Sequence, residues 1–131
     1  MLFRSAPDQI EQVKARLAQH GLSSSSLQAT IEIESDEVAD LLVPTLEAAT
    51  ALNAKILFVS VKAGEMDKQI VYDRLRRAGE KAAEYGITIG METHPDLITT
   101  ADLAIETMNG FDHPNLRVHY DTANLHSSNQ Y

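Results

Sequence analysis

The chain has 131 residues, of which 44% are hydrophobic and 23% charged, and this composition is typical of one globular domain. It has no cysteine, which excludes disulfides, thiolate metal sites and a cysteine nucleophile. The formal net charge of −8 would repel a polyanion, so no nucleic-acid partner is expected. We find no signal peptide in the first ten residues and no apolar run that could span a bilayer. We therefore expect a soluble, cytoplasmic protein with no membrane partner.

Helical patterns alternate with short apolar strands along the chain. Helix faces are formed by Ile10, Val13 and Leu17, by Val38, Leu42, Leu46 and Ala49, by Val71, Leu75, Ala78 and Ala82, and within Ala101–Met108. The predicted strands are Ser25–Ile31, Ala54–Val61, Ile87–Met91 and Leu116–Tyr120. Their starts lie about thirty residues apart, which is the length of one strand–helix unit. This alternation predicts an α/β fold with a parallel sheet and right-handed crossovers.

Residues that favour helix ends mark the same boundaries. Helices are expected to start after Ser5, Ser35 and Thr99, which can cap an N-terminus. They are expected to stop in a left-handed residue at Gly21, Asn53, Gly86 and Asn109–Gly110.

Three charged residues fall at the carboxyl ends of predicted strands. Alternation of side chains places the aliphatic residues of each strand on one face, where the helices should pack. Glu92, Asp121 and Lys62 fall on the opposite, interior face. Loops converge at this end of a parallel sheet, so it is where sites are built. Either acid alone could be a helix N-cap or a solvated loop residue, but two acids in matching phase favour a shared site.

Other polar residues near this end are weaker candidates. His94 follows Glu92 by two residues and could line the same opening or be a loop histidine. Lys62 could meet a hydroxyl-rich or anionic substrate or extend into solvent. His119 is interpreted as a satisfied interior histidine, and Asn124 follows Asp121 in the next loop.

The segments GITIGMETHP and HPNLRVHYDTANLH resemble the xylose-isomerase-like superfamily of β/α barrels, most closely the sugar phosphate isomerases/epimerases. In that family one strand ends in a glutamate and the next in an aspartate, and both bind a divalent metal. Glu92 and Asp121 match these positions. The resemblance extends from the first helix to about Asn124, a position at which many members have histidine instead.

The resemblance also implies that much of the barrel is missing. A (β/α)8 barrel needs about 250 residues. The chain is therefore interpreted as one partial TIM-barrel domain, residues 1–131, carrying about strands three to six. The histidine and second glutamate that complete the family's site would lie beyond it. A fragment or truncated gene product is favoured over a homo-oligomer or an open α/β sheet. Weak metal binding and little or no catalysis are expected.

In an intact parent the resemblance implies proton transfer through an ene-diolate on a sugar or sugar phosphate. The metal would be Mn²⁺, Mg²⁺ or Co²⁺, with Zn²⁺ also possible. Glu92 would combine catalysis with metal binding, Asp121 would bind metal, and His94, Lys62 and Asn124 would bind substrate. Three alternatives remain open: an inosose-type polyol dehydratase, a non-catalytic half-barrel module, and the less favoured abasic-site DNA endonuclease.

Overall fold

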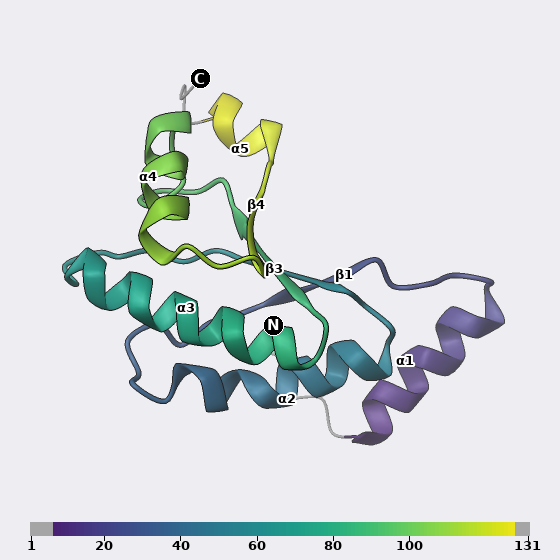
Figure 1. The fold of residues 1–131 in the computed structure, drawn as a ribbon. Helices are drawn as coiled ribbons and strands as arrows, with labels where there is room; N and C mark the ends of the chain where they lie inside the picture. Colours follow the sequence, from purple (N-terminus) through teal and green to yellow (C-terminus); the bar gives the residue numbers. More distant parts are fainter. Residues whose placement is uncertain (1–6, 128–131) are drawn as a thin grey trace.

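The computed structural model describes residues 7–127, which form five helices and four strands in alternation (Figure 1). The helices are α1 (Pro7–Gln19), α2 (Val38–Ala51), α3 (Lys68–Glu84), α4 (Ala101–Phe111) and α5 (Thr122–Ser127). The strands are β1 (Ser26–Ala29), β2 (Ile56–Val59), β3 (Thr88–Glu92) and β4 (Leu116–His119). The short helix α5 was not predicted.

The four strands form one parallel sheet in the order β1-β2-β3-β4. Each strand is followed by a helix before the next strand begins, so the predicted α/β alternation is confirmed. The registers pair Phe58 with Gly90 and Glu92 with His119, which brings the carboxyl ends of neighbouring strands to one edge. The strands β1, β2 and β4 are shorter than predicted, and Lys62 and Asp121 lie beyond their ends rather than within them.

The core lies between the sheet and the helices on one of its faces, where α2 and α3 run side by side (Figure 1). Strand residues in alternate positions supply it, as the predicted phase requires. The fully buried strand side chains are Leu57, Val59, Ile89, Met91 and Leu116. They meet the apolar faces of α2 and α3, which contribute Val38, Leu42, Leu46, Val71, Leu75, Ala78 and Ala82.

Three of the predicted helix stops are confirmed. Gly21, Asn53 and Gly86 have φ of 63°, 61° and 65°. The stop at Asn109–Gly110 is wrong by two residues, because α4 continues through Phe111 and its left-handed residue is Asp112. A Cβ on Gly110 would lie 2.4 Å from the ring of Tyr72, so this glycine serves close packing of α4 on α3.

The predicted helix starts are displaced or replaced. Thr100, rather than Thr99, caps α4 through a bond from the amide of Leu103. The hydroxyl oxygen of Ser35 accepts from the amide of Glu37 in a turn before α2, and Ser35 does not cap that helix. Ser5 lies outside the described residues. Within residues 7–127, no helix has the length and apolarity needed to cross a membrane.

Candidate functional site

The two acids singled out from the sequence belong to adjacent strand ends. Glu92 is the last residue of β3, is half-buried, and is paired in register with His119 of β4. Asp121 lies two residues after β4 and is also half-buried. Both acids therefore stand at the carboxyl edge of the sheet, on strands that are hydrogen-bonded neighbours.

A buried threonine, Thr93, ties these two strand ends together. Its hydroxyl donates to the carbonyl oxygen of Asp121 at 3.0 Å and accepts from the amide of Asp121 at 2.9 Å. Its own amide donates to the carbonyl of His119 at 3.1 Å. Only 5% of Thr93 is exposed, so these bonds are shielded from water. The backbone of Asp121 is thereby fixed relative to the residue that follows Glu92.

The carboxylate of Asp121 also caps the short helix α5. Its Oδ1 accepts from the amides of Ala123 at 2.8 Å and Asn124 at 3.2 Å. The alternative role considered for a lone acid, a helix N-cap, is thus present here. Among the described residues, no hydrogen bond or ion pair involves Oδ2, so the cap leaves one carboxylate oxygen for another partner.

The predicted substrate-binding residues lie in the loops that follow β2, β3 and β4. Lys62 is exposed three residues beyond β2, between the buried Val61 and Ala63. His94 is half-buried, and its Nδ1 is a buried nitrogen without a hydrogen-bond partner in the described part of the chain. Asn124 lies in the first turn of α5 and is half-buried. All three follow the same edge of the sheet as the acids.

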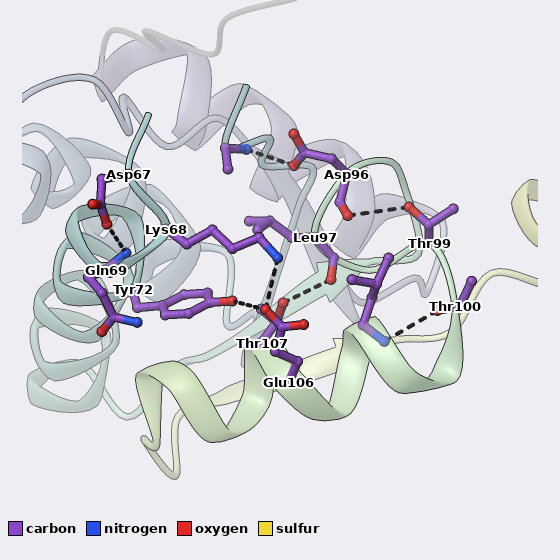
Figure 2. Close-up of polar contacts among 12 residues, drawn as sticks. Asp67, Lys68, Gln69, Tyr72, Asp96, Leu97, Thr99, Thr100, Glu106 and Thr107 are labelled. Atoms are coloured by element: carbon purple, nitrogen blue, oxygen red, sulfur yellow. Dashed lines mark hydrogen bonds and ion pairs between the residues drawn. The ribbon is translucent and has the colours of Figure 1, made fainter. Parts of the chain in front are cut away.

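Asp96, which the sequence did not single out, joins two of these loops (Figure 2). Its carboxylate oxygens accept from the amides of Ala63 at 2.8 Å and Gly64 at 2.9 Å. Burial raises the pKa of Asp96, but bonds from these amides and its own, with Lys68 nearby, outweigh it and leave that pKa below its usual value. Asp96 thus fixes the segment after Lys62 to the segment after His94. No local motif marks a contact that spans 33 residues.

The interior face of the sheet holds one ring pair. His119 stacks on Phe58 with ring centroids 5.1 Å apart and planes 25° apart. The two residues come from β4 and β2, and Gly90 of the intervening β3 leaves the space between them. A Cβ on Gly90 would lie 3.1 Å from the Cβ of His119. His119 is therefore an interior residue, in agreement with the interpretation from the sequence.

The oxygen atoms of Glu92 and Asp121 suit a hard divalent cation, but they are fewer than such a cation needs. Carboxylate oxygens are the ligands that Mg²⁺ and Mn²⁺ prefer, and Glu92 and the Oδ2 of Asp121 offer them at one edge. These cations need about six ligands. Within residues 7–127, no group of three or more histidine, aspartate or glutamate side chains could hold a metal ion. The described part of the chain therefore has two candidate ligands at this edge and no complete site.

The sequence matches the family model of the xylose isomerase-like TIM barrels over residues 1–131. It belongs to this family. The resemblance inferred from the two segments is therefore confirmed. No curated protein gives a significant match.

Solved structures of the same fold include a xylose isomerase-like TIM barrel protein from Mycobacterium smegmatis in complex with magnesium. The identity is 21%, the TM-score 0.76, and the match covers 93% of this chain and 48% of that one. The IOLI protein with a bound zinc atom matches at 18% identity with a TM-score of 0.72. That match covers 93% of this chain and 49% of the IOLI protein. D-allulose 3-epimerase from Methylomonas sp. in complex with D-allulose matches at 18% identity with a TM-score of 0.72. That match covers 89% of this chain and 48% of the epimerase.

The chain spans about half the length of these structures. Its four parallel strands with their helices are thus part of a β/α barrel, as expected. Structures of this fold include sugar epimerases and proteins with magnesium or zinc bound.

Proposed function

We propose that this chain supplies half of the active site of a divalent-metal-dependent sugar isomerase or epimerase, as one partial barrel domain. The observation that carries the proposal is the double hydrogen bond between Thr93 and the backbone of Asp121. It fixes the backbone of Asp121 relative to that of β3, so that two half-buried acids, Glu92 and Asp121, lie at adjacent strand ends. The bound magnesium, zinc and D-allulose in structures of the same fold support a metal and a sugar as ligands.

Glu92 and the Oδ2 of Asp121 would bind the metal, which would be Mn²⁺, Mg²⁺ or Co²⁺, with Zn²⁺ also accepted. The bound metal would polarise the carbonyl of the sugar and stabilise the charge that develops when the neighbouring carbon loses a proton. The cap formed by Oδ1 would restrict the orientation of the Asp121 carboxylate and so prepare Oδ2 for binding.

Side chains at the carboxyl edge of the sheet would transfer the proton and bind the substrate. Glu92 would take the proton from the carbon beside the carbonyl. Its return to the neighbouring carbon would isomerise the sugar, whereas epimerisation requires a second acid on the opposite face of the ene-diolate, which the half-site does not supply. His94, Lys62 and Asn124 would orient the hydroxyl groups, or a phosphate, of the substrate. Asp96 would keep the loops of Lys62 and His94 at a fixed separation through its bonds to Ala63 and Gly64.

Metal binding tests the assignment of ligands. Free Mn²⁺ would be followed by electron paramagnetic resonance in the 131-residue chain and in its Glu92→Gln and Asp121→Asn variants. We expect weak binding by the parent chain and a loss of about tenfold or more in each variant. Asparagine keeps the cap of α5, so Asp121→Asn removes charge without removing the cap.

Glu80→Gln is the matched control, because Glu80 is an exposed glutamate on α3, away from the strand ends. It should bind Mn²⁺ as the parent does. Equal binding by the parent and both ligand variants would refute the site.

Catalysis tests the claim that the site is only half present. With D-allulose as the probe and Mn²⁺ in excess, monomeric chain should give no epimerisation above background, measured by chromatography of the sugars. Turnover by the monomer would contradict the half-site if the Glu92→Gln variant abolished it. This result would show that the chain completes the reaction alone.

A further inference from the structure

An acid that the sequence did not single out lies level with three of the candidate site residues. One row of paired residues crosses the whole sheet, namely Ala29, Val59, Met91 and Val118. The residues three positions further on in each segment are Glu32, Lys62, His94 and Asp121. The last three of these are assigned above to substrate or metal. The register of the sheet therefore adds Glu32, after β1, to the same level of the carboxyl edge.

Alternate burial continues past the end of β1 and gives the direction of Glu32. Ile31 is 6% exposed and Ile33 packs against the same core, whereas Glu32 between them is exposed. The segment after β2 repeats this pattern around the exposed Lys62, whose two neighbours in sequence are buried. Side chains that alternate in this way lie on opposite faces of a strand. Glu32 and Lys62 thus both lie on the side away from the helices.

The loop that carries Glu32 is held in place from α3. Nη1 of Arg74 donates to the carbonyl oxygens of Ile33 and Glu34, both at 3.0 Å. Nη2 of the same guanidinium donates to the carboxylate of Asp36. The side chain of Arg74 is only 12% exposed, so these bonds are largely shielded from water. The carbonyl of Glu32 itself accepts from an amide three residues further on at 3.0 Å. The position of Glu32 is therefore fixed by its loop.

The surroundings of Glu32 favour contact with a substrate over contact with the metal. Within residues 7–127 it belongs to no group of three acids and histidines that could hold a metal ion, and β1 is separated from the strand of Glu92 by β2. No hydrogen bond or ion pair in this part of the chain engages the carboxylate of Glu32 or the ammonium of Lys62. Neighbouring strands lie about 4.8 Å apart, so one small ligand can meet both groups.

We propose that Glu32 is a further substrate-binding residue, positioned by Arg74, and that it selects a neutral sugar over a sugar phosphate. This inference rests on the proposed function. A carboxylate only accepts hydrogen bonds at neutral pH, and the hydroxyl groups of a sugar can donate them. The same carboxylate offsets the positive charge of Lys62, which alone would attract a phosphate. Removal of the charge on Glu32 should therefore have opposite effects on the two kinds of ligand.

Nuclear magnetic resonance titrations of the 131-residue chain test this assignment. D-allulose would be added in the presence of Mg²⁺, and inorganic phosphate in its absence. The amide signals of Glu32, Lys62 and His94 should shift with D-allulose. The Glu32→Gln variant should bind D-allulose about threefold or more weakly and phosphate about twofold or more tightly. Glu32 is exposed, so this variant should fold normally.

Glu37→Gln is the matched control, because it makes the same change in net charge at the other end of the loop. Glu37 is exposed before α2, and its side chain makes no cap bond. The control should bind both ligands as the parent does. Equal gains in phosphate binding by Glu37→Gln and Glu32→Gln would show a general effect of charge and would overturn the selective role of Glu32.

A double variant tests the role of Arg74. Arg74→Lys keeps the charge but loses the planar group that reaches two carbonyls at once, so it should weaken D-allulose binding. If Arg74 acts through Glu32, adding Arg74→Lys to Glu32→Gln should cause no further loss. Additive losses in the double variant would overturn the positioning role, since they would show that Arg74 acts independently of Glu32.

The titrations separate failure of this inference from failure of the proposed function. If D-allulose shifts the signals of Lys62 and His94 with equal affinity in the parent and in Glu32→Gln, the role of Glu32 is refuted and the proposed function stands. If D-allulose shifts no signal at the carboxyl edge of the parent chain, the proposed sugar site and the role of Glu32 are refuted together.

Discussion

At the scale of single residues, the loops at the carboxyl edge are held by a few polar side chains. Thr93 uses its hydroxyl as donor and acceptor to join the ends of β3 and β4. Asp96 uses both carboxylate oxygens to join the loops after β2 and β3. Neither residue is a candidate ligand. Thr93 fixes the backbone of one candidate ligand relative to the other, and Asp96 fixes the loops that carry Lys62 and His94.

Replacement of Asp96 by asparagine should lower the free energy of unfolding by about 1 kcal/mol near neutral pH, since charge-assisted bonds at an exposed residue are screened. The pKa of Asp96 is lower in the folded chain, so its contribution exists above the unfolded pKa of about 4. It is lost as pH falls through the folded pKa. Urea unfolding of both proteins at several pH values would measure this loss.

Glu65→Gln is the control, since Glu65 is an exposed acid that directly follows Gly64, whose amide donates to Asp96. Its effect should be small at every pH. A stability difference for Asp96→Asn that stays constant down to about pH 2 would contradict the role of the charge.

The positions of Glu92 and Asp121 at one edge of the sheet were predictable from the sequence, but their surroundings were not. Strand phase and alternation placed Glu92 and Asp121 at one edge, because both depend on local pattern. The cap that Asp121 makes with α5 was considered only as an alternative. The contacts of Asp96 were missed, since a carboxylate that binds amides 32 and 33 residues away leaves no local pattern.

At the scale of elements, helix lengths reflect both turn chemistry and packing. Left-handed residues end α1, α2 and α3 where glycine or asparagine predicted them. In α4 a glycine predicted the wrong end of the helix. Gly110 lies within α4 and packs against Tyr72, and the left-handed residue that ends the helix is Asp112. A glycine near a helix end can thus be either a left-handed stop or a site of close packing. Only the contacts with the neighbouring helix distinguish the two.

Replacement of Gly110 by alanine tests this reading. An exposed helical glycine usually gains stability from alanine, by about 1 kcal/mol. Here the new Cβ would meet the buried ring of Tyr72, so we expect a loss of about 1–3 kcal/mol in thermal or urea unfolding. Combining Gly110→Ala with Tyr72→Leu should recover part of the loss. A stabilised single variant would show that α3 and α4 separate easily.

At the scale of the molecule, the net charge is strongly negative. The chain carries a formal charge of −8, so it repels other anions over the distance that salt leaves unscreened. A phosphorylated sugar would therefore approach the proposed site against this average field.

The ring pair of Phe58 and His119 connects two strands that are not neighbours in the sheet. It joins β2 and β4 directly across β3, at the one position where that strand carries no side chain. The loop after β2 holds Lys62, and the segment after β4 holds Asp121. The ring contact therefore links the strand before Lys62 to the strand before Asp121 with no side chain of β3 between them. A Cβ on Gly90 would lie 3.1 Å from the Cβ of His119, so a larger residue at this position would crowd the ring pair and disturb this link.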